Sequence, residues 1–253
     1  MDVLDHGYVN LIESWGSDEI IIESARMSTG RGFKGWGHWY CSTCETGFGG
    51  GSDCPLCQGQ GEYKSGDERL LRYLWEHKHH SPFEMGGLTV EVQAPIFVFR
   101  EWHRHRTQSY NELSARYTEL PDLYYTPSIS RLMAGKQSSA NKQGSEGGFT
   151  EELARKFQIE IELITTQCRS AYELLLANGV SRELARLVIP VNQYSRMRAS
   201  ANLRNWLAFL SLRMDPAAQF EIREYANTVG DIIKDRFPRT WELFTEGKQD
   251  GSH

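Results

Sequence analysis

The stretch REWHRHRTQSYNELSARY, residues 100–117, places four arginines and two histidines within eighteen residues of a chain whose formal net charge is −5. Serine, asparagine and glutamate residues are interspersed among these basic side chains. Guanidinium groups bind phosphate and carboxylate oxygens through paired hydrogen bonds, and hydroxyl and amide groups bind the other polar atoms of a small ligand. The alternative is a solvated charged surface, which most arginine-rich stretches form. The stretch by itself leaves both interpretations open.

Three further arginines lie in segments that are otherwise apolar. They are Arg186 in ELARLVIP, Arg204 in ANLRNW and Arg213 in FLSLRMD. A buried guanidinium needs a partner, because an unpaired charge is costly to remove from water. These arginines outnumber the acids near them, which favours a shared anionic ligand over a solvated surface.

The segment RHRTQSYNELSARY resembles the RHRxxSxNExSxR signature of the flavin-dependent thymidylate synthases, the ThyX family. Every specified position agrees: Arg104, His105, Arg106, Ser109, Asn111, Glu112, Ser114 and Arg116. The segments ESARMS, HHSPFEM, LARLVIPVNQYSR and NLRNWLAFLSLRMDPAAQ resemble other parts of the same family. The resemblance therefore covers most of the chain and leaves residues 35–66 unmatched.

The resemblance implies a fold and an activity. The fold is α+β, a ThyX-like mixed α/β domain over residues 1–253 with several long helices and a small antiparallel sheet. The activity is that of an FAD-dependent methyltransferase, which converts dUMP to dTMP with 5,10-methylenetetrahydrofolate as carbon donor and NADPH as reductant of the bound FAD. The family also implies a homotetramer whose active sites are shared between subunits.

Matching positions imply roles for individual residues. The candidate catalytic residues are Arg213, Ser114 and His79. The candidate dUMP contacts are Glu101, Arg104, Glu112, Ser114, Ala115, Arg116, Arg186 and Arg213. The candidate FAD contacts are Ser28, Ser81, Glu84, Arg104, His105, Arg106, Asn202 and Arg204. No general base is evident beside Ser114, so we assign it to binding rather than to nucleophilic attack. His79 could instead be one of several solvated histidines.

Two positions depart from the common pattern of the family. Ala217 and Ala208 stand where some members carry a histidine and an asparagine. Each change removes a polar contact near the flavin or the folate.

Four cysteines, Cys41, Cys44, Cys54 and Cys57, form two CxxC pairs. Two such pairs supply four thiolates, which complete a tetrahedron around Zn²⁺. Disulfides or a redox pair are the alternatives, and the polar N-terminal sequence MDVLDHGYVN, which does not resemble a secretory signal, argues against disulfides. We therefore expect residues 35–66 to form a zinc-ribbon-like insertion. The zinc would be structural, since four thiolates leave no open coordination position.

Apolar spacing and capping residues predict the main elements. We expect strands within residues 8–16 and 82–95, and helices from Ser17, within 67–80, from Pro95 through Arg106, from Thr150 to Asn178, from Ser181 to Pro190, from Ser200, and from Asp215 to Phe237. Residues 133–148 lack periodicity and are predicted to be a loop.

The composition limits the classes of function. A pI near 5.9 argues against a general nucleic-acid-binding protein, and no apolar run is long enough to span a bilayer. We expect a cytoplasmic enzyme. Two alternatives remain: a related flavoenzyme that yields 5-hydroxymethyl-dUMP, and a non-catalytic nucleic-acid-binding zinc protein.

Overall fold

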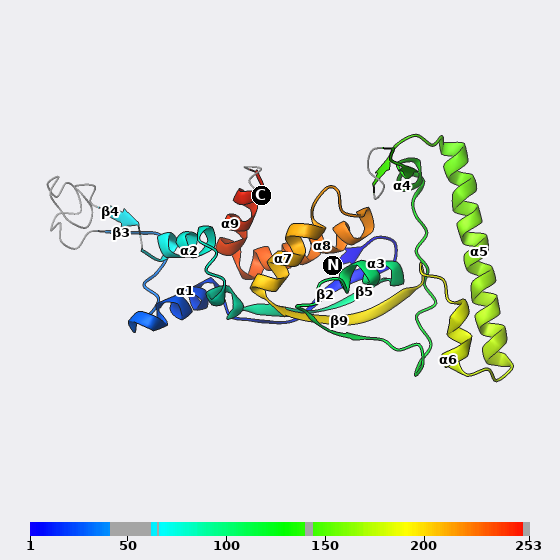
Figure 1. Cartoon of the computed structure of the whole chain (residues 1–253), viewed down its shortest axis with the longest axis horizontal. Coiled ribbons are helices and arrows are strands. Elements are labelled where there is room, and N and C mark those ends of the chain that lie inside the picture. The colour runs from blue at the N-terminus through cyan, green and yellow to red at the C-terminus, as the bar shows by residue number, and fades with distance from the viewer. Residues whose placement is uncertain (41–61, 65, 140–143, 250–253) are drawn as a thin grey trace. The chain divides into compact units, whose positions relative to one another are not determined.

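The computed structural model describes residues 1–40, 62–64, 66–139 and 144–249 (Figure 1). The chain forms two compact units. Unit 1 contains residues 1–13, 88–201 and 205–232, and unit 2 contains residues 14–87, 202–204 and 233–253. Each unit is therefore assembled from segments that are distant in the sequence.

A five-stranded sheet has the order β1-β2-β5-β9-β6 (Figure 1). Its strands are β1 (Asp2–Val3), β2 (Gly7–Trp15), β5 (Gly87–Pro95), β9 (Tyr194–Asn202) and β6 (Ser109–Glu112). The pairs at both edges, β1 with β2 and β6 with β9, are antiparallel. Leu88, Val90 and Val92 are fully buried at alternate positions of β5, which confirms the strand predicted from that alternation.

Three helices lie wholly or mostly in unit 1: α3 (Ile96–Trp102), α7 (Leu203–Arg213) and α8 (Phe220–Arg236). The Trp102 ring of α3 stacks on Phe209 of α7 with 4.6 Å between ring centroids. Trp206 of α7 donates its indole N–H to the carbonyl of Leu88 in β5 over 2.9 Å. The hydroxyl of Tyr225 in α8 bonds to another β5 carbonyl. Aromatic side chains thus fix these helices to the central strand of the sheet.

The prediction for the segment after Pro95 is only partly confirmed. Pro95 is the N-cap rather than the first helical residue, and α3 ends at Trp102. The residues Arg104–Arg106 therefore lie beyond the helix. The Tyr110 hydroxyl donates to the carbonyls of Trp102 and His105, over 3.2 and 2.6 Å, and holds this turn in place.

The long helix of unit 1 has the predicted ends. It is α5 (Glu151–Ala177), with the Thr150 hydroxyl accepting a bond from the Leu153 amide and Asn178 as C-cap before Gly179, whose φ is 78°. The apolar stripe on α5 is only partly covered within the chain, since Tyr172 is buried whereas Phe157 and Ile164 are exposed. The helix therefore presents apolar surface that the described residues of this chain leave exposed.

Unit 1 also contains shorter elements. They are α4 (Ile129–Met133), β7 (Lys136–Gln137), β8 (Ser145–Glu146), α6 (Arg182–Ala185) and the 3₁₀ helix η3 (Arg186–Val188). The predicted loop over residues 133–148 thus contains a small antiparallel pair, β7 with β8.

Two further predictions were wrong. Ser200 does not open a helix but lies in β9, where its hydroxyl accepts a bond from the Thr89 hydroxyl over 2.9 Å. Asp215 and Pro216 form a turn rather than the start of a helix, because the Asp215 carboxylate accepts the amide of Ala217 and α8 begins at Phe220.

Unit 2 is mainly helical. Its elements are α1 (Asp18–Arg26), the 3₁₀ helices η1 (Met27–Thr29) and η2 (Ser81–Glu84), α2 (Gly66–Glu76), α9 (Pro238–Gln249), and the strand pair β3 (His38–Tyr40) and β4 (Glu62–Lys64). Ser17 caps α1 as predicted, accepting a bond from the Ile20 amide. The sequence pattern gave no indication of α9. The buried Asp18 carboxylate accepts bonds from the amides of Arg239 and Thr240 and so caps the first turn of that helix.

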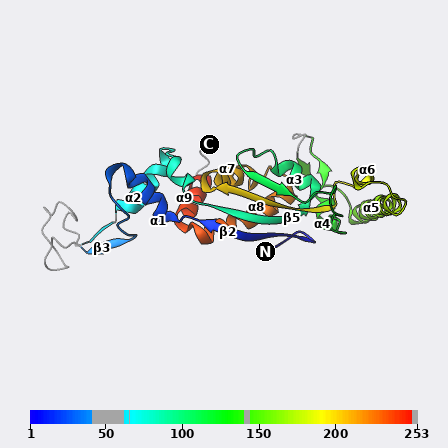
Figure 2. The same cartoon turned by 90° about the horizontal axis from the view of Figure 1, so that it is seen from below.

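No helix in the described ranges is both long and apolar enough to cross a bilayer. Figure 2 shows the same elements from below, with β2, β5 and β9 lying side by side as neighbouring strands.

Candidate functional site

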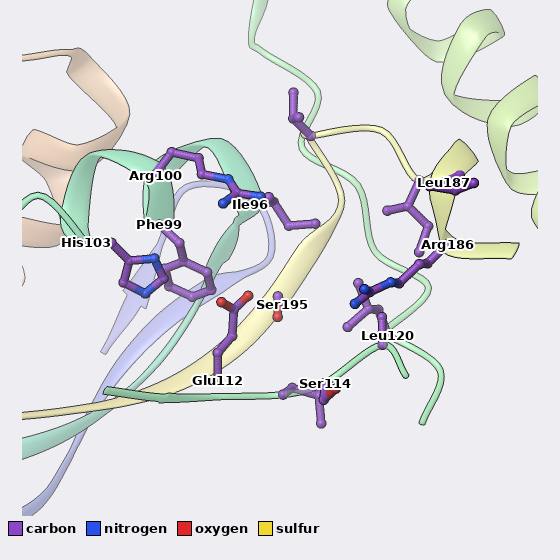
Figure 3. Close-up of a pocket in the computed structure, with 14 residues that line it drawn as sticks. Ile96, Phe99, Arg100, His103, Glu112, Ser114, Leu120, Arg186, Leu187 and Ser195 are labelled. Carbon is purple, nitrogen blue, oxygen red and sulfur yellow. The ribbon is translucent and has the colours of Figure 1, made fainter. Parts of the chain in front are cut away.

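A cavity of about 620 Å³ lies in unit 1 between β6, β9, α3 and the segment around η3 (Figure 3). Its polar lining residues are Arg100, His103, Glu112, Ser114, Arg186 and Ser195. Its apolar lining residues are Ile96, Phe99, Leu113, Leu120, Leu187, Ile189 and Val191, and Ala115 completes it. A volume of this size accommodates a small-molecule ligand, and a mostly apolar wall with a few polar groups is typical of such sites.

The register of two strands places polar groups on the cavity side of the sheet. Glu112 of β6 pairs with Met197 of β9, and the Leu113 amide donates to the carbonyl of Arg196 over 2.8 Å. Because side chains alternate between the faces of a strand, Ser195 shares the face of Met197 and of Glu112. Figure 3 shows Glu112 and Ser195 together on this side of the cavity.

The structure brings together four of the predicted dUMP-binding residues. Glu112, Ser114, Ala115 and Arg186 line the same cavity although Arg186 is distant from the others in sequence. The Arg186 guanidinium has no ion-pair or hydrogen-bond partner among the described residues. An unpaired cation beside an apolar pocket is suited to an anionic ligand.

The other predicted dUMP contacts are not among the lining residues of this cavity. They are Glu101, Arg104, Arg116 and Arg213. Arg116 instead forms an exposed ion pair with Glu183, in which the two side-chain atoms are 3.2 Å apart. A contact of this kind is weak and readily exchanged for a ligand.

Arg213, the last residue of α7, is held by two partners. Its Nη1 bonds to the Glu101 carboxylate over 2.7 Å and its Nη2 to the Glu101 carbonyl over 2.8 Å. Its Nε–H is donated to Nε2 of His105 over 2.9 Å. Three donors of the guanidinium are thus engaged, and the side chain is largely buried, with 16% of it exposed. This arrangement fixes a positive charge in one orientation.

His105 is neutral in this arrangement. Burial, and then the charge of Arg213, lower the pKa of His105 to about 4, against the opposing effect of Glu101. Because Nε2 accepts the bond from Arg213, the ring proton lies on Nδ1. His105 thus orients Arg213 in addition to the flavin contact that the resemblance implies.

The remaining signature arginines are exposed. Arg104 and Arg106 flank His105, and neither has a hydrogen-bond or ion-pair partner within the part of the chain that the structure describes. Two exposed guanidinium groups, two positions apart in the sequence and unpaired among the described residues, are suited to a diphosphate.

Unit 2 contains the other predicted flavin contacts. Glu84 of η2 and Arg204 form an ion pair, in which the closest atoms are 3.6 Å apart. His79 and Ser81 line a second hollow of about 490 Å³. His79 lies edge-on to the Tyr73 ring with 5.5 Å between centroids. Ser28 is exposed in η1, and Asn202 ends β9. The structure thus pairs Glu84 with Arg204 and places His79 and Ser81 at the wall of one hollow.

The predicted zinc ligands Cys41, Cys44, Cys54 and Cys57 lie outside the described residues. The backbone on either side of them is described. β3 and β4 pair antiparallel, with Tyr40 opposite Glu62. The chain therefore enters and leaves this segment at neighbouring positions.

Sequence reasoning missed three polar residues of the first cavity: Arg100, His103 and Ser195. Arg100 and His103 belong to the basic stretch 100–117, but the family signature does not specify them. Arg100 lies four residues after Ile96, and His103 lies four residues after Phe99. This helical spacing, which places the four side chains on one face, was the signal available in the sequence. The sequence contained no signal for Ser195. Its position depends on the strand β9, and the last residues of that strand were predicted to be the start of a helix.

Comparisons with known proteins show the family of this chain. The family model described as "Thymidylate synthase complementing protein" (Thy1) matches residues 10–239. A flavin-dependent thymidylate synthase of Thermus thermophilus is 38% identical over 250 residues, covering 99% of this chain and 80% of that protein. One of Wolbachia pipientis wMel is 36% identical over 244 residues, covering 96% of this chain and 75% of that protein.

A solved structure is also similar. It is a UMP/dUMP methylase, PolB, from Streptomyces cacaoi bound with 5-Br UMP, with a TM-score of 0.76 and 30% sequence identity over 97% of this chain and 96% of that chain. The match extends over both units of the fold. The chain therefore belongs to the Thy1 family, the family of the flavin-dependent thymidylate synthases, as the signature around Arg104 predicted.

Proposed function

We propose that this chain catalyses the reductive methylation of dUMP to dTMP, with 5,10-methylenetetrahydrofolate as carbon donor and NADPH as reductant of bound FAD. The observation that carries the proposal is the cavity that gathers Glu112, Ser114, Ala115 and Arg186. These residues come from two distant segments, and each matches a dUMP-binding position of the family. The reaction belongs in the cytoplasm, where nucleotide precursors and reduced pyridine nucleotides are available.

Arg186 and Ser114 would bind the nucleotide phosphate. The guanidinium supplies paired donors for phosphate oxygens, and the serine hydroxyl supplies one more. Arg213 would stabilise the negative charge that develops on the uracil ring, because a fixed cation in a partly dry site costs no reorganisation during the reaction. Glu101 and His105 would hold that cation in place.

Arg213 does not line the cavity that contains Arg186. A homotetramer with shared sites would allow the two arginines of different subunits to act on one nucleotide. The exposed apolar residues of α5, among them Ile159 at 63% and Leu163 at 51% exposure, support an interface of this kind. We therefore propose that the active enzyme is the tetramer.

The predicted flavin contacts fit the chemistry of FAD. Arg104 and Arg106 are exposed and lack partners among the described residues, as binding of the FAD diphosphate requires. Neutral His105 would bind another polar part of the cofactor. The Glu84–Arg204 pair of unit 2 is a further candidate flavin contact by the family resemblance. When bound, FAD supplies the reducing equivalents, and the protein supplies position and charge.

We further propose a structural zinc held by Cys41, Cys44, Cys54 and Cys57. The antiparallel pairing of Tyr40 with Glu62 supports a closed insertion, because it brings together the two ends of the cysteine-containing segment. Asp67 adds support at the base of this segment, since its carboxylate accepts the amides of Lys34 and Gly35 over 2.6 and 2.9 Å.

The test of the function is product analysis. Purified protein supplied with FAD, dUMP, 5,10-methylenetetrahydrofolate and NADPH should convert dUMP to a product with the mass of dTMP. A product with the mass of 5-hydroxymethyl-dUMP would replace the proposed reaction by hydroxymethylation. Protein that binds no flavin and consumes no dUMP would overturn the proposal.

UMP is a second candidate substrate. A similar solved structure is described as that of a UMP/dUMP methylase, and the match covers 97% of this chain. Parallel reactions with UMP and dUMP would decide between them, since 5-methyl-UMP and dTMP differ by one oxygen atom in mass.

A further inference from the structure

Ser195 carries a buried hydroxyl without a partner. The residue is 1% exposed, and its Oγ makes no hydrogen bond to any described residue. Buried polar groups are bonded in more than nine cases in ten, because leaving one unsatisfied costs free energy. The residue lines the cavity that holds Glu112 and Arg186. An occupant of that cavity can supply the missing partner, because the residue forms part of the cavity wall.

A second serine of the same strand provides the contrast. Ser200 also lies in β9 and faces β5, where its hydroxyl is bonded to that of Thr89 over 2.9 Å. Ser200 does not line the cavity. The hydroxyl of Ser200 is thus bonded within the protein, whereas the hydroxyl of the cavity-lining Ser195 is free to bond a ligand.

The neighbour of Ser195 indicates which ligand group fits. Glu112 shares its face of the sheet through the pairing of Glu112 with Met197, and Figure 3 shows the Glu112 carboxylate extending toward Ser195. A carboxylate repels phosphate oxygens and carbonyl oxygens and accepts a bond from a hydroxyl. A ligand hydroxyl can donate to Glu112 and at the same time accept from Ser195. A sugar hydroxyl satisfies both groups at once.

We infer that Ser195 and Glu112 form the subsite for the 3′-hydroxyl of the nucleotide. This inference rests on the proposed function, because 3′-OH is the one free sugar hydroxyl of dUMP. The cationic Arg186 would then contact the phosphate, and the apolar wall of the cavity would contact the base. Ser195 is thus a substrate-binding residue in addition to those that match the family signature.

An isosteric pair of variants isolates the hydroxyl. Ser195→Thr keeps it, and Ser195→Val replaces it with a methyl group of the same shape, so any packing cost is common to both. Binding of dUMP and of 2′,3′-dideoxyuridine 5′-monophosphate to the FAD-loaded proteins is measured by calorimetry. Ser200→Ala, which removes a hydroxyl of the same strand outside the cavity, is the control.

We expect Ser195→Val to bind dUMP about tenfold more weakly than Ser195→Thr does. The dideoxynucleotide should bind both variants equally, since it lacks the group that Ser195 recognises. Ser200→Ala should bind dUMP as the wild type does. An equal loss for both nucleotides, or no loss for dUMP, would overturn the subsite while leaving the proposed function intact. Wild-type protein that fails to bind dUMP would overturn both.

Discussion

Arg213 donates its Nε–H to Nε2 of His105 over 2.9 Å, and the two residues lie 108 positions apart in the sequence. The bond requires that His105 be unprotonated on Nε2, because a protonated ring has no acceptor. The side chain that orients the cationic Arg213 is therefore sensitive to acid.

The first prediction concerns stability in acid. The pKa of His105 is lowered to about 4 in the fold, from an ordinary value of 6.5. The unfolded chain therefore binds the proton more tightly, and the contribution of neutral His105 is present above pH 6.5 and is lost as the pH falls through about 4. In His105→Gln, whose amide oxygen can still accept from Arg213, this contribution is absent. The melting temperature of the wild type should fall more steeply between pH 6.5 and 4 than that of the variant, as measured by circular dichroism. Parallel curves would contradict this.

The second prediction concerns Arg186. Because its guanidinium is exposed and has no partner among the described residues, Arg186→Ala should leave the melting temperature nearly unchanged. Binding of dUMP should weaken by about 2–4 kcal/mol, the loss expected for a charge-assisted contact with phosphate. Calorimetric titration with dUMP measures the effect, and Arg155→Ala, an exposed arginine of α5, is the control. Wild-type affinity in a well-folded variant would refute the assignment.

For Arg213 the expected pattern is different, because Arg213 is bonded inside the chain. Arg213→Ala leaves the Glu101 carboxylate and Nε2 of His105 without their partner, so it should cost about 1–2 kcal/mol of unfolding free energy in addition to activity. Arg213→Lys should restore charge but not turnover, since an ammonium cannot bond Glu101 and His105 in the same geometry. Urea denaturation and steady-state kinetics test the two effects. Full turnover in the lysine variant would show that charge alone suffices.

The zinc proposal predicts a separable effect. Replacing Cys41 and Cys44 together with serine should abolish stoichiometric zinc, measured by atomic absorption, while flavin absorbance is retained. Activity should fall without being lost, because a site with four thiolates cannot activate water. Replacing the isolated Cys168 with serine is the control and should leave the zinc content unchanged. Loss of all flavin together with the metal would show that the insertion belongs to the cofactor site.

The last prediction concerns the exposed apolar residues of α5, which we expect to lie in the interface between subunits. The double replacement Ile159→Lys and Leu163→Lys places two charges on adjacent turns of its apolar surface and should dissociate the oligomer. Light scattering should then report a smaller mass, and activity should fall in parallel. Glu162→Lys, on an exposed polar position of the same helix, should change neither. A variant tetramer with full activity would remove α5 from the interface.

The sequence predicted best those features that depend on neighbouring residues. Ser17 and Thr150 cap the helices that they were expected to cap, since an N-cap depends on a side chain and an amide three residues away. The signature likewise grouped Glu112 with Ser114, and both residues line one cavity.

Features that depend on distant residues were missed. Ser200 resembles an N-cap, yet pairing of β9 with its neighbours in the sheet extends the strand past it and delays the helix to Leu203. The N-terminus of α9 is capped by Asp18, more than two hundred positions earlier in the chain. Neither relationship leaves a local pattern. For the same reason Ser195 could not be recognised until the register of β6 and β9 was known.

The pairing of Tyr40 with Glu62 has a consequence for how such a protein can change over time. A segment whose two ends meet across a strand pair can be lengthened, shortened or exchanged without altering the path of the chain on either side. Joining Tyr40 to Glu62 through a two-residue turn would close the hairpin and leave every element of the five-stranded sheet in its place. Gain or loss of residues 41–61 in a single genetic step would therefore leave the path of the flanking chain unchanged, and selection could adjust this segment without rebuilding the sheet.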